Sequence, residues 1–93
     1  MATQLIADAT AAATSADFDV TTAPVTVMLS YTPANATLIT RTQTFIDMKD
    51  AAGNYIPVYT LYGSEKAVQL AAPGTYRVRK QETTYAVGVD RSA

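Results

Sequence analysis

The chain has 93 residues, a formal net charge of −1 and only 16% charged residues, and it contains neither cysteine nor histidine. The two absences exclude disulfides, thiol nucleophiles, serine–histidine pairs and metal sites built on imidazole or thiolate. The basic residues form no run, so no long-range field attracts nucleic acid or an anionic membrane, and we expect neither as a partner. The length predicts a single domain.

The first fifteen residues are rich in alanine and threonine and show no amphipathic stripe at helical spacing. We interpret residues 1–15 as an extended N-terminal arm or a first edge strand. Leu5 and Ile6 are the large apolar residues of this segment and could anchor it on a neighbouring surface. The segment has no cationic start and only a short apolar run, so we expect no secretion signal.

Two alternating runs follow. Residues 16–21 (ADFDVT) predict a short strand with Asp17 and Asp19 on its solvent face. Residues 25–32 (VTVMLSYT) alternate over eight positions and predict the clearest half-buried strand of the chain.

The run at residues 36–48 is long for one strand, and its apolar pattern changes partway. This change predicts a bulge or bend near Thr42, and the alternative is two short strands joined tightly. Residues 50–54 (DAAGN) then predict a hairpin loop, in which Gly53 or Asn54 is available for a left-handed conformation.

Three apolar-periodic runs, at residues 55–62, 67–71 and 75–79, are separated by short breaks of turn-like composition. We interpret them as a meander of three strands joined by hairpins. The second break contains Pro73 and Gly74, a pair that suits a type II turn.

The C-terminal part predicts a closing strand at residues 83–89 and a loose tail at residues 90–93. Together these runs make seven or eight short strands, and no segment has a convincing helical pattern. The sequence therefore predicts an all-β fold, a small antiparallel β-sandwich or barrel-like domain over residues 16–93.

Four acidic residues form the two carboxylate pairs that could act as acid and base or hold calcium: Asp17 with Asp19, and Asp47 with Asp50. The first pair lies on the solvent face of its strand, and the second lacks the oxygen-ligand spacing of a calcium loop. We therefore expect surface and turn positions for all four, with no catalytic residue, metal or cofactor.

The strand expected at residues 55–62 carries Tyr55, Tyr59 and Tyr62, and both of its faces are apolar or aromatic. Either the strand is central to the core, or one face meets a partner, for which tyrosine is well suited. Pro57 removes a ladder donor, so we expect an edge or a bulge there, or cover from a neighbouring chain. Stacked tyrosines could instead bind sugar.

Arg77 and Arg79 share one strand face, opposite Tyr76 and Val78. Their guanidinium groups could bind a carboxylate, a phosphate or a partner backbone, and the alternative is an ordinary charged outer face of the sheet. The complete set of candidate interface residues is Tyr55, Pro57, Tyr59, Tyr62, Arg77, Arg79, Leu5 and Ile6.

The order of these segments resembles the layout of small β-sandwich structural proteins of tailed bacteriophage virions, particularly head decoration or cement proteins. The resemblance covers nearly all of the chain. It rests on the opening LIADATAAATSADFDV, the strand VTVMLSY, the hairpin FIDMKDAAGNYIPVYTL, the segment VQLAAPGTYRVRK and the alternating end TTYAVGV.

The resemblance implies a non-enzymatic protein that is made in the host cytoplasm and located on the capsid surface of the virion. Its implied partners are the major capsid protein and further copies of itself, with a homotrimer favoured. Another virion component, such as a head fibre base, a tail-tube or a head-completion protein, fits the same features. A module that binds carbohydrate or a cell surface is the alternative from a different class.

Overall fold

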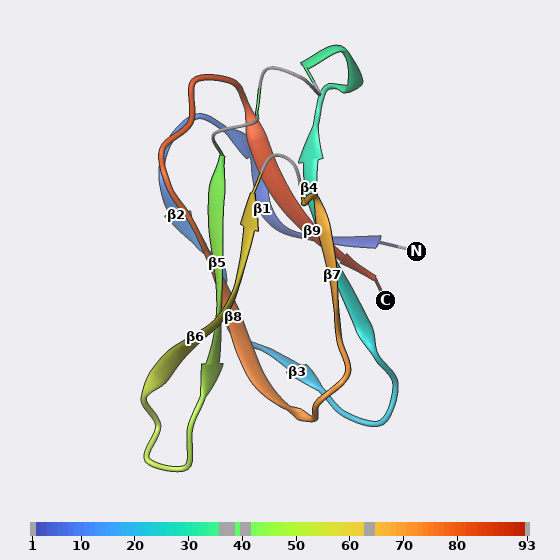
Figure 1. Cartoon of the computed structure of the whole chain (residues 1–93), viewed down its shortest axis with the longest axis vertical. Coiled ribbons are helices and arrows are strands. Elements are labelled where there is room, and N and C mark those ends of the chain that lie inside the picture. The colour runs from blue at the N-terminus through green and yellow to red at the C-terminus, as the bar shows by residue number, and fades with distance from the viewer. Residues whose placement is uncertain (1, 36–38, 40–41, 63–64, 93) are drawn as a thin grey trace.

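Two antiparallel sheets packed face to face make up the computed structural model of the chain, which describes residues 2–35, 39, 42–62 and 65–92 (Figure 1). The strands in this part of the chain are β1 (Ala2–Ala9), β2 (Ala13–Thr14), β3 (Phe18–Val20), β4 (Val25–Tyr31), β5 (Gln43–Lys49), β6 (Tyr55–Tyr62), β7 (Ala67–Leu70), β8 (Gly74–Lys80) and β9 (Val87–Ser92), and a 3-10 turn spans Pro33–Asn35. The expectation of a small antiparallel β-sandwich is confirmed.

The sheets have simple strand orders. Sheet A has the order β1-β9-β4-β7, and sheet B has the order β2-β8-β5-β6, with β3 also paired to β8. In sheet B, therefore, β8 and β5 are central, and β6 forms one edge.

The meander predicted for residues 55–79 is wrong. Strands β6 and β8 both pair with β5 in sheet B, whereas β7 between them pairs with β4 in sheet A. The chain thus crosses from one sheet to the other and back. Residues 63–64 lie outside the described residues, but the partners of β6 and β7 exclude a hairpin between these strands. A break of three or four residues is long enough for a hairpin and also for the roughly 10 Å step between packed sheets. The length of the break therefore does not show which of the two connections the chain makes.

The turn predicted at Pro73-Gly74 is also different. Gly74 is the first residue of β8, and its φ of 159° is not the value near +80° that a type II turn requires. The glycine therefore begins a strand and does not close a hairpin.

The last strand lies further along the chain than predicted. It spans Val87–Ser92, so residues 90–92 are not a loose tail. Val87 and Val89 are fully buried, and Arg91 continues the inward alternation, with its Cζ 5.3 Å from the ring centroid of Phe18. The long apolar stem of arginine lets the strand continue past its last valine.

Of the run predicted at residues 36–48, residues 36–38 and 40–41 lie outside the described residues. The bulge is not at Thr42, which lies just before β5 and whose amide donates to the carbonyl oxygen of Ile39 at 3.0 Å. It lies in the hairpin itself, where Ile46 pairs with Tyr59 and Asp47 with Pro57, which leaves Val58 as the extra residue of β6. The hairpin loop is as predicted, with Asp50 bonded to Asn54 and Gly53 at a φ of 86°.

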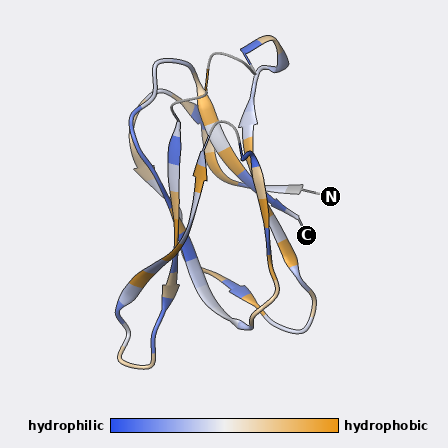
Figure 2. Ribbon diagram, viewed as in Figure 1, coloured by the Kyte–Doolittle hydropathy of each residue, from blue (hydrophilic) through white to orange (hydrophobic). Residues whose placement is uncertain are grey.

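The core fills the space between the two sheets. Its buried side chains come from every strand except β2, with Ile39 added from the segment between β4 and β5: Ile6, Phe18, Val20, Val25, Val27, Leu29, Ile39, Ile46, Leu61, Leu70, Tyr76, Val78, Val87 and Val89. Figure 2 shows hydrophobic and hydrophilic positions alternating along the strands, the pattern of a sheet with one buried and one outer face. In the residues that the structure covers, no helix is long and apolar enough to cross a membrane.

One cation lies inside this core. Lys80 is 2% exposed, and its Nζ donates to the carbonyl oxygens of Ala9 and Val87. Burial lowers the pKa of the ammonium group, and the negative charge of Asp8 opposes that shift. The two hydrogen bonds tie β8 of sheet B to the end of β1 and the start of β9 in sheet A.

Candidate functional site

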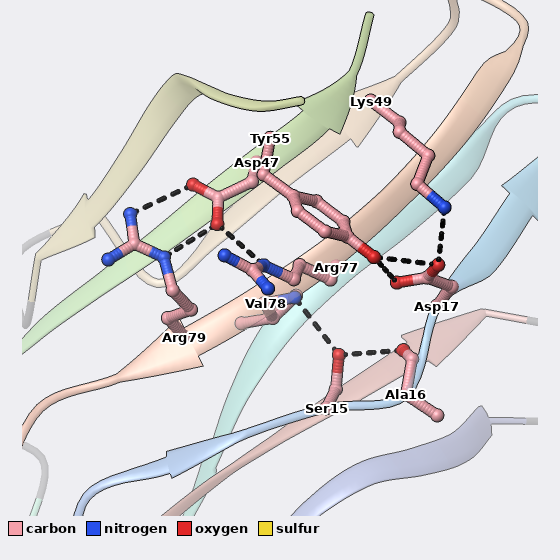
Figure 3. A network of polar contacts seen from close by, with 9 residues as sticks. All are labelled: Ser15, Ala16, Asp17, Asp47, Lys49, Tyr55, Arg77, Val78 and Arg79. Atoms are coloured by element: carbon pink, nitrogen blue, oxygen red, sulfur yellow. Dashed lines mark hydrogen bonds and ion pairs between the residues drawn. The ribbon is translucent and has the colours of Figure 1, made fainter. Parts of the chain in front are cut away.

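The outer face of sheet B carries most of the charged and aromatic side chains that the sequence singled out. The register of β5 with β8 places Asp47 opposite Arg77 and Phe45 opposite Arg79. These side chains form a polar network with others from β6 and the segment before β3, whose members are Asp17, Asp47, Lys49, Tyr55, Arg77 and Arg79 (Figure 3).

Asp47 is the centre of this network, and its side chain is only 1% exposed although it lies on the outer face. Its Oδ2 accepts hydrogen bonds from Nε of Arg77 at 2.9 Å and Nε of Arg79 at 2.6 Å, and its Oδ1 accepts one from Nη2 of Arg79 at 2.9 Å. Burial raises the pKa of this carboxyl, but the hydrogen bonds and charges of the two guanidinium groups outweigh it, so the pKa is lowered.

The expected surface position of Asp47 is therefore wrong, because two long arginine side chains cover it. The two guanidinium groups bind a carboxylate, as the sequence suggested they could, but it belongs to the same chain. The residue spacing within β5 did not indicate that Asp47 binds the two arginines, since this contact depends on the pairing of β5 with β8.

The other acidic residues lie at the surface or in a turn. Asp50 is a turn residue as expected, and its Oδ1 accepts from the amides of Ala52 and Asn54 at 2.9 and 2.8 Å. Asp19 accepts from the hydroxyl of Thr75 at 2.8 Å. No cluster of three or more potential metal ligands occurs within the described ranges.

Tyr55 is held by its own chain. Its ring centroid lies 3.6 Å from Cζ of Arg77, and its hydroxyl donates to the carboxylate of Asp17 at 2.8 and 2.9 Å. The hydrogen bond from Tyr55 is the largest influence on Asp17, whose pKa is lowered, and Lys49 lies 3.4 Å from the same carboxylate. Tyr55 therefore closes the network against the segment before β3 (Figure 3).

Strand β6 presents a different surface. Four large apolar side chains are exposed on it, at 47% for Ile56, 47% for Val58, 37% for Tyr59 and 43% for Tyr62. We call these four residues the β6 surface. Pro57 is exposed among them, on a strand that is both an edge and bulged, as its proline predicted.

The alternative that residues 55–62 form a central core strand is wrong, since only Leu61 of this strand is buried. Ile56 and Val58 belong to the exposed surface although the sequence did not select them. The sequence signal that could have identified them is the presence of apolar residues on both faces of the strand at residues 55–62.

Leu5 and Ile6 lie elsewhere. Both are in β1, at the edge of sheet A, and they are not brought together with the β6 surface. Ile6 is 6% exposed and belongs to the core of its own chain, and the half-buried Leu5 packs against that core. Strand β1 is paired with β9 along its length, with two register shifts.

Comparison with protein families and with curated proteins gives no match. Among solved structures, the chain is similar to the SPBc2 prophage-derived protein YomS, with a TM-score of 0.68 and 13% sequence identity over 98% of this chain and 88% of that one. The two proteins share the fold over almost their full lengths, and the neighbour is a phage-derived protein.

Proposed function

We propose that the chain is a non-enzymatic structural protein of a bacteriophage virion, which binds the outside of the assembled capsid and stabilises it as a decoration or cement protein. The observation that carries the proposal is the exposed β6 surface. The prophage origin of a protein with the same fold supports a phage role.

The β6 surface has the chemistry of a protein contact. Large apolar side chains and tyrosines are typical of interface centres, and each apolar Å² removed from water contributes about 25 cal/mol. The four residues all lie on the edge strand β6, and this strand contains no charged residue that would have to be desolvated. On a capsid, many such contacts act together, so each can be weak.

The state of Tyr55 supports a protein contact over a sugar platform. A sugar-binding platform needs the face of an aromatic ring to be free for stacking, but the ring of Tyr55 is covered by Arg77 and its hydroxyl is bonded to Asp17. Tyr59 is also partly engaged, since its hydroxyl donates to Glu65 at 2.7 Å.

The test is co-sedimentation with capsids assembled from the major capsid protein of the phage genome that encodes this chain. We expect the chain to sediment with these capsids at saturable stoichiometry and to raise their melting temperature. Tyr59→Ser should weaken binding by about tenfold, because the loss of one interface anchor costs roughly 1–2 kcal/mol. Tyr85→Ser is the matched control, since Tyr85 has the same 37% exposure but lies outside β6.

Failure of the wild-type chain to bind these capsids would refute the capsid role, and equal losses in the two variants would refute the β6 surface as the contact. The native mass, measured by light scattering on the wild type, tests the favoured trimer, which corresponds to three times the 9.9 kDa of one chain.

A further inference from the structure

A groove of about 420 Å³ lies beside the polar network, on the outer face of sheet B. It is lined by Ala12, Ala13, Thr14, Phe45, Arg79, Lys80 and Gln81. The strand registers explain its shape, because Arg79 lies between Thr14 on one neighbouring strand and Phe45 on the other. The short side chains of residues 12–14 leave open space on one side of Arg79, and the phenyl ring of Phe45 forms the wall on the other side.

The guanidinium group of Arg79 donates hydrogen bonds to Asp47 through only one of its two faces. Arginine has five N–H donors that can form two separate two-pronged faces. Asp47 occupies the side face through Nε and Nη2. In the described part of the chain, Nη1 donates to no acceptor, and Figure 3 shows the third guanidinium nitrogen pointing away from Asp47. The end face, made by Nη1 and the second N–H of Nη2, therefore remains available.

The charge in the groove is positive. The two guanidinium groups of Arg77 and Arg79 and the single carboxylate of Asp47 leave one positive charge, and Asp47 stays ionised at neutral pH because its pKa is lowered. That carboxylate is 1% exposed, so a ligand meets the guanidinium and not the acid beneath it. None of the lining residues is acidic, and the ammonium of Lys80 is directed to backbone carbonyl oxygens instead.

An apolar wall accompanies this charge. Cζ of Arg79 lies over the ring of Phe45, 5.1 Å from its centroid, and the ring and the guanidinium group both line the groove. A ligand that fits both would carry a carboxylate and an apolar group a few ångströms apart. An acidic side chain next to an aromatic one in a protein segment has this arrangement.

We propose that this groove binds an acidic side chain of a partner protein, aspartate or glutamate, with an adjacent apolar side chain of the same segment packed on Phe45. The carboxylate accepts both hydrogen bonds from the end face of Arg79, while Asp47 holds the guanidinium in place. The proposal is independent of the virion role, because the groove is separate from the β6 surface and is tested on the isolated chain.

The experiment is a titration of the ¹⁵N-labelled full chain, followed by NMR, with the blocked dipeptide acetyl-Glu-Phe-amide. We expect saturable shifts confined to residues 12–14, 45 and 79–81, with a Kd on the order of 1–10 mM, typical of one ion pair and one ring contact. The matched probe acetyl-Gln-Phe-amide, which lacks only the charge, should bind at least about fivefold more weakly. Acetate alone should also bind more weakly than the dipeptide.

Three variants locate the site. Arg79→Met should abolish the shifts. Lys49→Met is the control, because Lys49 is a positive charge on the same face that pairs with Asp17 and not with Asp47, and it should leave the Kd within about twofold. Thr14→Glu places a competing carboxylate beside Arg79 and should weaken dipeptide binding at least fivefold, so it decides the question if Arg79→Met fails to fold.

Equal affinity for the Gln and Glu dipeptides, or no saturable shift at 50 mM, would overturn the proposal. If acetate binds as tightly as the dipeptide, the ligand of the groove is a free small carboxylate and not a protein segment. Unchanged binding in Thr14→Glu would place the ligand elsewhere.

Discussion

Strands β6 and β8 lie on the two sides of β5, and both carry large apolar side chains, but these side chains have opposite surroundings (Figure 1). In β8, Tyr76 and Val78 are 3% and 0% exposed, whereas in β6, Val58 and Tyr59 are 47% and 37% exposed. Strand β8 has neighbours on both edges, while β6 is the last strand of its sheet. Burial in this protein therefore depends on what lies beside and across a strand, since β6 has more apolar residues than β8 but buries fewer of them.

The largest effect expected from this comparison is on tyrosine. Tyr76→Ala should lower the free energy of unfolding by about 3–5 kcal/mol, because Tyr76 stacks on Phe18 at 6.0 Å and donates to the carbonyl oxygen of Ala72 at 2.7 Å. Tyr59→Ala should lower it by less than about 1 kcal/mol and leave the β-type circular dichroism intact. Urea unfolding measures both, and similar losses in the two variants would contradict the contrast between the strands.

Replacing one valine in each strand by alanine makes the same comparison between β8 and β6 with a smaller loss of side-chain volume. Val78→Ala should cost about 1–3 kcal/mol, since it leaves a cavity between the sheets, and Val58→Ala should stay within about 0.5 kcal/mol. The midpoint of urea unfolding at a constant m-value gives both values. A cost for Val58→Ala close to that of Val78→Ala would place β6 in the core.

Asp47 tests the contact between β5 and β8. Asp47→Asn should cost about 1–2 kcal/mol at pH 7, because three hydrogen bonds lose their charge while the two arginines remain partly in water. The folded pKa of Asp47 is below its ordinary value of 3.8, so the carboxylate contributes fully above that value and its contribution is lost as the pH falls through the folded pKa. Unfolding at pH 7 and pH 3 should therefore show a smaller difference between variant and wild type at pH 3. A constant difference would assign the cost of the substitution to something other than charge.

The smallest effect on folding, but a visible one on assembly, is expected at Pro57. A proline on an edge strand lacks a donor and, with the bulge at Val58, hinders pairing with another strand. Pro57→Val should change the unfolding free energy by less than about 1 kcal/mol and produce assemblies larger than those of the wild type. Light scattering over a range of concentrations measures this, and Pro73→Val, an exposed position outside any strand, is the control. No difference between the two variants would show that Pro57 does not protect the edge.

The candidate surfaces could be predicted only in part. Pro57 indicated an edge or a bulge in residues 55–62, and the strand has both, whereas the apolar and aromatic composition of this run left open a core strand or a partner contact. The roles of Asp47 and Phe45 could not be read from the sequence, because each depends on the register of β5 with β8, which is set by residues about 30 positions away. The groove at Arg79 depends further on β2, which supplies only small side chains.

The sequence alone specified an all-β chain, since period-2 alternation and β-branched residues favour strands through local geometry. It also determined the hairpin at Gly53, because a positive φ is a local requirement. The pairing of the strands became visible in the three-dimensional fold alone, since a short break fits either a hairpin or a step between sheets. For the same reason, the tertiary structure leaves Ile56, Val58, Tyr59 and Tyr62 of β6 exposed, buries Leu61, and places Tyr76 and Val78 of β8 in the core.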